Sequence, residues 1–335
     1  MNSYNLLKLW SVLSGFALIL ANDSYAETKL KFGIPTNLGS VINSTANDAS
    51  ICFSPDGLEL YFGSDRSSGQ GNFDIWLTTR PTPTDAWGWP VNLGPPINTS
   101  AVDSAPCLSA DGLELYFASD RPGGSGSIDL WVTTRTTLQS SWSTPANLGT
   151  TVNTWADECF PVMSSDGLEL YFSEYTVPHP SGYGGGDIWV VKRASVQEPW
   201  GIAENLGPTV NTSLPEMASQ ISADGLHLYF NSSGHPGYGV EDTWVTTRIS
   251  HSDPWGEPVN LGPSVNSTAW DAGPVFSPDG SKLYFSSNRY GSYGNGSYDI
   301  WQVSVSVVST SDVDENGVVD MRDFAAFAED WLWEE

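Results

Sequence analysis

The chain has 335 residues and a formal net charge of −26, from 13 basic and 39 acidic side chains. This excess of negative charge argues against nucleic acid and anionic membrane surfaces as partners, because both are bound by clustered lysine and arginine. Cations and neutral polymers such as sugars remain as the expected classes of partner. The 33 glycines, 22 prolines and 15 tryptophans, with only 16% charged residues, are typical of a turn-rich all-β protein rather than a helical bundle or a disordered chain.

Residues 1–26 have the organisation of an export signal. Lys8 supplies positive charge, residues 13–21 form a short apolar run, and residues 24–26 read Ser-Tyr-Ala, a cleavage site of the small-residue type. The apolar run is too short to span a membrane, and no later stretch reaches that length. The sequence therefore predicts a protein without a membrane span that is exported to the periplasm, the cell surface or the medium.

Three short motifs recur with one shared period over the following 270 or so residues. Asp-Gly begins at residues 56, 111, 166, 224 and 279. Asn-Leu-Gly begins at residues 37, 92, 147, 205 and 260, and Asp-x-Trp at residues 74, 129, 187, 242 and 299. A fixed period of this length indicates a solenoid or a propeller.

Each repeat has the pattern of four short strands. In the second repeat these strands are predicted at residues 104–108, 113–119, 129–135 and 145–148, separated by an Asp-Gly turn, a Gly/Ser loop and a polar loop. Four antiparallel strands repeated radially form the blade of a β-propeller. Five repeats therefore predict a five-bladed β-propeller over residues 27–308.

The two ends of the repeat region complement each other. The first Asn-Leu-Gly precedes the first Asp-Gly, and the fifth repeat stops after its third strand. Residues 32–38 are therefore expected to supply the fourth strand of the fifth blade. Closing the ring in this way removes the open sheet edges.

The repeat unit resembles those of PD-type, WD-repeat-related propellers. Asn-Leu-Gly is followed by Val/Ile-Asn, an acid, Ser-x-Asp-Gly-Leu-Glu-Leu-Tyr-Phe and Asp-Ile-Trp, a pattern that covers residues 32–305. Such propellers occur in TolB-like periplasmic proteins and in envelope proteins fused to peptidoglycan-binding domains. The resemblance implies the propeller fold and an envelope-associated protein that binds a ligand or a protein partner.

One acid opens the first strand of every repeat. Because it recurs, it is expected to cap a loop of the blade, and the alternative is a ring that attracts cations at the mouth of the central channel. The five acids predicted at this mouth are Asp48, Asp103, Asp157, Glu216 and Asp271.

Three cysteines lie in or next to predicted strands. Cys52, Cys107 and Cys159 form neither a disulfide framework nor a C-x-x-C motif. They are expected to be small core residues, with a disulfide involving Cys159 as the alternative.

Aromatic residues that are not repeated gather in the loops of one face. This is the face of the inter-blade loops and of the loops between the second and third strands of each blade. The predicted ligand-binding rim consists of Trp155, Trp270, Tyr183, Tyr238 and Tyr293. Exposed aromatic rings beside polar groups suit stacking on sugars, although these rings can also pack the long loops on which they lie.

Carboxylates on the same face allow an enzymatic alternative. Glycoside hydrolysis takes two carboxyl groups on either side of the scissile bond. The best single candidate for a general acid is Glu174, because the other four repeats have serine at this position; Asp157, Glu158 and Glu241 complete the set.

Residues 309–335 have a different pattern from the propeller. Oxygen-bearing residues occupy the positions of a calcium-binding loop, and an apolar helix face follows with Phe324, Phe327 and Trp331. The predicted Ca²⁺ ligands are Asp312, Asp314, Asn316, Val318 through its carbonyl, Asp320 and Asp323. The segment resembles half of a dockerin. Dockerins carry two such segments and this sequence shows one, which argues against a cohesin partner. The resemblance still implies an extracellular attachment or assembly signal.

The sequence thus predicts an exported, non-catalytic propeller with a calcium-binding tail. Its expected partner is a polysaccharide or an envelope protein. A secreted glycoside hydrolase and a purely structural interaction scaffold are the two alternatives.

Overall fold

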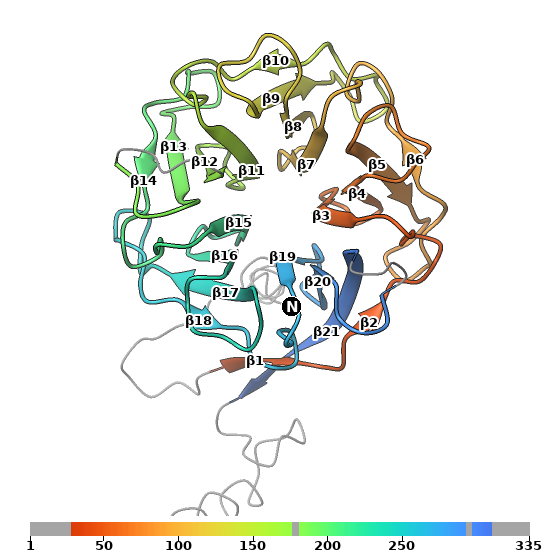
Figure 1. Cartoon of the computed structure of the whole chain (residues 1–335), viewed down its shortest axis with the longest axis vertical. Helices are drawn as coiled ribbons and strands as arrows, with labels where there is room; N and C mark the ends of the chain where they lie inside the picture. Colours follow the sequence, from red (N-terminus) through yellow and green to blue (C-terminus); the bar gives the residue numbers. More distant parts are fainter. Residues whose placement is uncertain (1–27, 176–180, 293–296, 310–335) are drawn as a thin grey trace, which may run out of the picture.

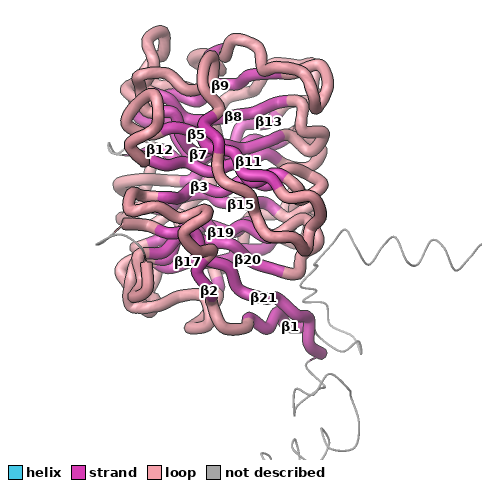
Figure 2. Tube along the Cα trace, turned by 90° about the vertical axis from the view of Figure 1, so that its right-hand side faces the viewer, coloured by secondary structure: helices cyan, strands magenta, loops and turns pink. Residues whose placement is uncertain are grey.

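Five antiparallel sheets stand as blades around a common axis in the computed structural model of the chain, which describes residues 28–175, 181–292 and 297–309 (Figure 1). The structure confirms the predicted all-β, five-bladed propeller of four-stranded blades. Seen from the side, the loops gather on two opposite faces (Figure 2). We call the face that carries the inter-blade loops and the loops between the second and third strands the upper face. Within the described residues, no helix is long and apolar enough to cross a membrane.

Each blade runs from an inner strand next to the axis to a two-residue outer strand. The first blade contains β3 (Asp48–Phe53), β4 (Glu59–Ser64), β5 (Asp74–Thr79) and β6 (Val91–Asn92). The second contains β7 (Asp103–Leu108), β8 (Glu114–Ser119), β9 (Asp129–Thr134) and β10 (Ala146–Asn147). The third contains β11 (Asp157–Met163), β12 (Glu169–Tyr175), β13 (Ile188–Lys192) and β14 (Glu204–Asn205). The fourth contains β15 (Glu216–Ile221), β16 (His227–Ser232), β17 (Asp242–Thr247) and β18 (Val259–Asn260). The fifth contains β19 (Asp271–Phe276), β20 (Lys282–Ser287), β21 (Asp299–Ser309) and β2 (Thr36–Asn37), and β1 (Thr28–Phe32) pairs with the end of β21.

The repeated Asp-Gly forms the tight turn between the first two strands of each blade. In the first blade Asp56 Oδ1 accepts hydrogen bonds from Ser54 Oγ at 2.6 Å and from the Leu58 amide at 3.0 Å. Gly57 has a φ of 70°, a left-handed conformation that a side chain disfavours. The same pair of residues therefore makes the same turn in all five blades.

The Leu-Tyr-Phe run of each second strand joins neighbouring blades. Because side chains alternate along a strand, Leu60 and Phe62 pack toward Tyr284 of the fifth blade, while Tyr61 packs toward Phe117 of the second. All of these side chains are at most 2% exposed. The core of the protein thus consists of the layers between blades.

A buried network of hydrogen bonds explains the other two motifs. Asn37 of Asn-Leu-Gly donates through Nδ2 to Asp299 Oδ2 at 2.7 Å, and its Oδ1 accepts from Asn43 Nδ2 at 2.9 Å. Asn43 in turn bonds both the amide of Ile300, at 2.8 Å, and the carbonyl of Ile300, at 3.0 Å. The same aspartate–asparagine–asparagine network recurs in the other four blades.

The N-terminal segment closes the ring as predicted. β2 pairs with the third strand of the fifth blade, with Asn37 opposite Trp301. The predicted single strand over residues 32–38 is interrupted, because Pro35 has no amide hydrogen to donate. Before the interruption, β1 follows the end of β21 and extends outward from the ring (Figure 2).

The three cysteines are free thiols. Cys52 Sγ accepts a hydrogen bond from the Leu108 amide at 3.2 Å, and Cys107 Sγ accepts one from the Met163 amide at 3.3 Å. Each of these bonds joins two adjacent blades. Cys159 is buried, so the expectation of a core residue is confirmed and the alternative of a disulfide is not.

We predict that ring closure depends on β2 and much less on β1. Deleting residues 27–39 removes the outer strand of the fifth blade together with Asn37, and exposes a sheet edge. Because each kcal/mol lost lowers Tm by roughly 2–4 °C in a domain of this size, we expect a drop on the order of 10 °C, or aggregation, in differential scanning calorimetry. The control deletion of residues 27–31 keeps β2 and should melt within a few degrees of the parent. Equal melting of all three proteins would refute the role of β2.

Candidate functional site

The inner strands enclose two cavities along the propeller axis. The upper cavity, of about 420 Å³, is lined by inner-strand residues that follow the first one, by the loops that precede the first and third strands, and by Asn231 and Ser286 of two second strands. The lower cavity, of about 280 Å³, is lined by the other ends of the inner strands and by the Asp-Gly turns. They meet at six residues that line both: Ile51, Pro106, Pro161, Val162, Ser219 and Val275. The upper cavity therefore opens on the face where the non-repeated aromatic residues were predicted.

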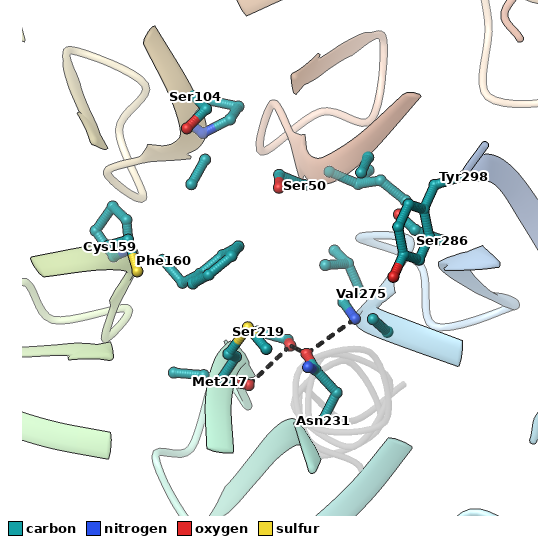
Figure 3. A pocket seen from close by; sticks show the side chains of 18 of the residues that line it. Ser50, Ser104, Cys159, Phe160, Met217, Ser219, Asn231, Val275, Ser286 and Tyr298 are labelled. Carbon is teal, nitrogen blue, oxygen red and sulfur yellow. Dashed lines mark hydrogen bonds between the residues drawn. The ribbon is translucent and has the colours of Figure 1, made fainter. Parts of the chain in front are cut away.

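Bulges in the inner strands shape the wall of the upper cavity. Residues Ser50, Ala105, Phe160 and Gly273 all have φ between 51° and 63°, and the pairing register shifts at each of them. A bulge of this kind redirects a side chain out of the regular alternation of a strand. In the third blade the Phe160 ring consequently projects into the cavity (Figure 3).

One repeat position contributes a different residue to the upper cavity in each of four blades. It is the position immediately before the aspartate of Asp-x-Trp. There the cavity wall is formed by Phe73, Ile128, Glu241 and Tyr298. Trp270 lies beside them, 37% exposed, with its ring edge-on to Tyr298 at a centroid distance of 6.5 Å. Most of the mouth of the cavity is therefore apolar and aromatic.

A carboxyl–amide pair interrupts this apolar wall. Glu241 is 3% exposed and accepts a hydrogen bond from Asn231 Nδ2. Asn231 Oδ1 accepts from the Gly273 amide at 3.2 Å and from Ser219 Oγ at 3.3 Å, which joins the pair to two inner strands (Figure 3). Burial raises the pKa of Glu241 to about 7, and the negative charge of Asp271 acts in the same direction.

The charge of the wall limits the ligands that it can take. Of the described residues that line the upper cavity, one is acidic, Glu241, and none is lysine, arginine or histidine. An anionic ligand would thus be buried beside a carboxyl group with no cation to receive it. A neutral or positively charged ligand fits the wall.

The predicted aromatic rim divides into two groups. Trp270 lines the upper cavity, whereas Trp155, Tyr183 and Tyr238 are 56%, 50% and 52% exposed and lie outside its lining. Tyr293 lies outside the described residues. Trp270 is therefore the rim residue that the structure brings to the cavity.

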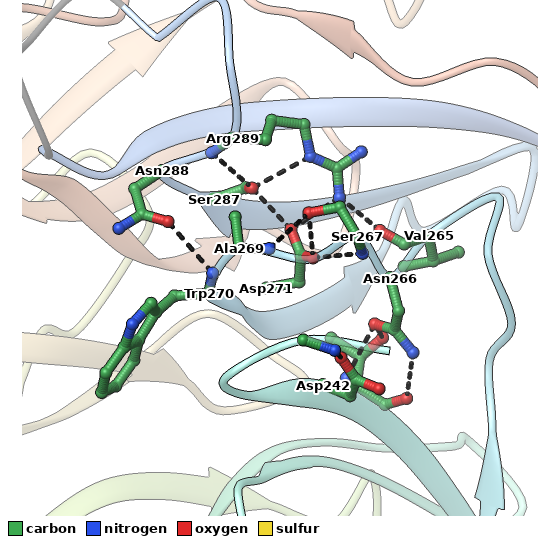
Figure 4. Close-up of polar contacts among 12 residues, drawn as sticks. Asp242, Val265, Asn266, Ser267, Ala269, Trp270, Asp271, Ser287, Asn288 and Arg289 are labelled. Carbon is green, nitrogen blue, oxygen red and sulfur yellow. Dashed lines mark hydrogen bonds and ion pairs between the residues drawn. The ribbon is translucent and has the colours of Figure 1, made fainter. Parts of the chain in front are cut away.

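The five acids predicted at the channel mouth do not face the channel. Asp48, Asp103, Glu216 and Asp271 are 0% exposed and point into the loops of their own blades. Asp271, for example, accepts from the amide and hydroxyl of Ser267, from Ser287 Oγ at 2.5 Å and from Arg289 at 2.6 Å (Figure 4). These side chains cap loops, because the strand alternation turns the first residue of the inner strand away from the axis.

The choice of Asp157 as the acid of the third repeat was wrong by one residue. Glu158 is the equivalent of Asp48, because it accepts the Thr154 amide at 2.9 Å just as Asp48 accepts the Ser44 amide at 2.6 Å. Asp157 instead lies half-buried and accepts from the Ile128 amide at 3.1 Å. The longer Glu158 side chain reaches the same loop from the same place on the strand.

The carboxyl groups proposed for hydrolysis are not brought together at the cavity. Glu158 and Glu174 are opposite each other on β11 and β12, where burial raises their pKa values to about 8 and about 7. Glu158 Oε2 is buried without a hydrogen-bond partner among the described residues. Both residues are outside the lining of the upper cavity, which contains Glu241 alone of the four candidates.

Phe160 and Tyr298 belong to the site but were not predicted. The signal for Phe160 was Pro161, because a proline inside an inner strand indicates a bulge. No equivalent signal marks Tyr298, whose role follows from the repeat position that it shares with Glu241.

Metal binding was predicted for the C-terminal tail, and all six of its proposed ligands lie outside the described residues. Residues 28–175, 181–292 and 297–309 contain no group of three or more acidic, histidine or cysteine side chains placed to hold a metal ion.

No protein-family model and no curated protein matches the chain. Among solved structures, it is similar to a BT0996 RGII complex, with a TM-score of 0.56 and 8% identity over 84% of this protein and 92% of the other. It is also similar to a thermostable family-43 glycoside hydrolase, with a TM-score of 0.51 and 12% identity over 80% and 91% of the two proteins. TolB from Acinetobacter baumannii superposes with a TM-score of 0.49 and 14% identity over 83% of this protein; the match spans 63% of TolB, less than two thirds of its length. Identities this low show a shared fold alone.

We predict that replacing Glu174 stabilises the protein increasingly as pH rises. A folded-state pKa raised from 4.5 to about 7 means that the native state holds a proton which the unfolded state has lost, so stability falls as pH rises through this interval. Glu174→Ser restores the serine of the other repeats and should raise the free energy of unfolding by on the order of 1–2 kcal/mol at pH 8, with little gain at pH 4. Urea denaturation at both pH values measures this.

The control for this experiment is Glu257→Gln, which changes an exposed glutamate. Its effect on the free energy of unfolding should be small at both pH values. A Glu174→Ser effect that is the same at pH 4 and pH 8 would show that the charge of Glu174 does not destabilise the fold.

Proposed function

We propose that this protein is an exported glycan-binding propeller whose upper cavity receives a sugar ring against Trp270. The observation that carries the proposal is the composition of the cavity wall: Trp270, Tyr298 and Phe160 supply aromatic surface, and Asn231 and Glu241 supply polar groups within the same 420 Å³. Sugars have an apolar face and a polar edge, and they are bound by this combination of groups.

Three features favour binding over the alternatives. Trp270 keeps 37% of its surface exposed and lines the cavity, so its ring is accessible to a ligand there. The cavity is within the usual range of small-molecule sites, roughly 300–1,000 Å³. Hydrolysis in its common form takes two carboxyl groups at the bond, and the described wall supplies one.

The remaining parts of the proposal come from the sequence. The signal-like residues 1–26 support export, and the acidic composition supports a neutral or basic polymer as ligand. The spacing of acids in residues 312–323 supports a Ca²⁺ site in a dockerin-like tail, which would attach the propeller to an extracellular assembly or to polysaccharide. Glycoside hydrolysis remains the alternative function, and release of products is its signature.

We predict that Trp270→Ala lowers glycan affinity by about 1–3 kcal/mol, as loss of an aromatic anchor does, without changing Tm. The binding partner is first identified by retention of the full-length protein on a glycan array, and affinity is then measured by isothermal titration calorimetry. Trp89→Ala is the matched control, because Trp89 is 73% exposed in the loop between β5 and β6, on the opposite face.

Each outcome of that experiment decides between functions. Retention that depends on Trp270 but not on Trp89 supports the proposal. Release of shortened products would replace it with the glycoside hydrolase. Retention of no glycan would favour the structural scaffold and overturn the proposal.

We predict that Ca²⁺ orders the tail without altering the propeller. The close carboxylates of residues 312–323 repel each other until a cation binds them, and the short helix predicted after them is marginal on its own. Titrating the full-length protein with Ca²⁺ should therefore increase helical circular dichroism, and Asp312→Ala should weaken the effect. A flat titration in the parent protein would show that the spacing is accidental.

A further inference from the structure

Glu241 and Asn231 are side chains that the blade itself does not require. At the position of Glu241 the other four blades have Phe73, Ile128, Gly186 and Tyr298. At the position of Asn231 they have Gly63, Ala118, Ser173 and Ser286. Four blades of the same architecture thus form with apolar, small or hydroxyl residues here, and only the fourth blade carries the carboxyl–amide pair.

This pair is costly for the fold. The carboxyl of Glu241 is 3% exposed, and among the described residues it accepts one side-chain hydrogen bond, from Asn231. The equally buried Asp271 accepts four hydrogen bonds, one of them from a guanidinium. A buried carboxylate with so few donors costs free energy, and such a group in a cavity wall is a candidate for binding.

The surroundings of Glu241 suit a positive charge. Trp270 is its neighbour through a parallel β-bridge, and Tyr298 is edge-on to Trp270. Aromatic faces attract cations, and a carboxylate forms its strongest hydrogen bonds with charged donors. The described part of the lining has no lysine, arginine or histidine to compete for Glu241.

We propose that the upper cavity selects a sugar with a free, protonated amino group, which Glu241 receives while Trp270 stacks on the ring. This inference rests on the proposed function and specifies its ligand as an amino-sugar glycan. Glu241 determines specificity, since a neutral N-acetylated ring would meet the same aromatic wall but leave the carboxylate without a charged partner. Asn231 positions Glu241 through their hydrogen bond.

The test compares two oligosaccharides of one backbone. Isothermal titration calorimetry with the full-length protein measures a hexamer of β-1,4-linked glucosamine and its fully N-acetylated counterpart. We expect the free-amine hexamer to bind at least about tenfold more tightly, because a hydrogen bond between charged groups is worth more than a neutral one. Glu241→Gln should remove this preference, so that the variant binds the two hexamers with affinities within about threefold of each other.

Glu174→Gln is the matched control, because Glu174 is also a buried glutamate but lies outside the cavity lining. It should keep the preference. Thermal unfolding of all variants separates lost binding from lost structure, and if Glu241→Gln fails to fold, Asn231→Ser, which restores a residue found in other blades, replaces it and should reduce the preference.

Three results would overturn this inference. The first is equal affinity for the two hexamers, and the second is a preference that survives Glu241→Gln. The third is that the free-amine hexamer does not bind, although the glycan array retains the protein on a neutral glycan in a way that depends on Trp270. The third result leaves the proposed function intact. Retention on no glycan at all removes both proposals.

Discussion

A buried network of hydrogen bonds from aspartate to asparagine to asparagine is the constraint on which the rest of this propeller depends. In each blade it ties the third strand to the outer strand and to the loop that leads to the next blade. In the fifth blade the same bonds join Asn37 and Asn43, near the N-terminus, to Asp299 and Ile300, more than 250 residues later. One motif therefore builds the blades and closes the ring, and closure fixes the inner strands around the cavities.

Repetition separates the residues that hold the fold from those that form the site. The repeated acids are buried and accept hydrogen bonds from the loop before their strand, and in three blades each pairs with an arginine that also lies over aromatic rings. In the fourth blade His235 bonds the Val210 carbonyl as Arg289 bonds the Val265 carbonyl in the fifth, so a histidine supplies this one contact with the loop. The upper cavity instead uses positions at which the blades differ, such as that of Glu241 and Tyr298.

Sequence reasoning predicted the fold almost completely, because period, turns and strand patterns are local signals that five copies reinforce. It could not predict which way the inner-strand side chains face. The bulges at Ser50, Ala105, Phe160 and Gly273 break the alternation that such a prediction assumes, so Phe160 was overlooked. In the third repeat Asp157 and Glu158 are adjacent acids, and only the hydrogen bond to Thr154 distinguishes their roles.

The central claim is that the differences between repeats create one binding cavity on the upper face. A crystal structure of the full-length protein with a bound oligosaccharide tests this most directly. The account predicts a sugar ring in the upper cavity, stacked on Trp270 and hydrogen-bonded to Glu241. A sugar bound instead in the lower cavity, or on the exposed loops of Tyr183 and Tyr238, with the upper cavity free of sugar, would contradict it.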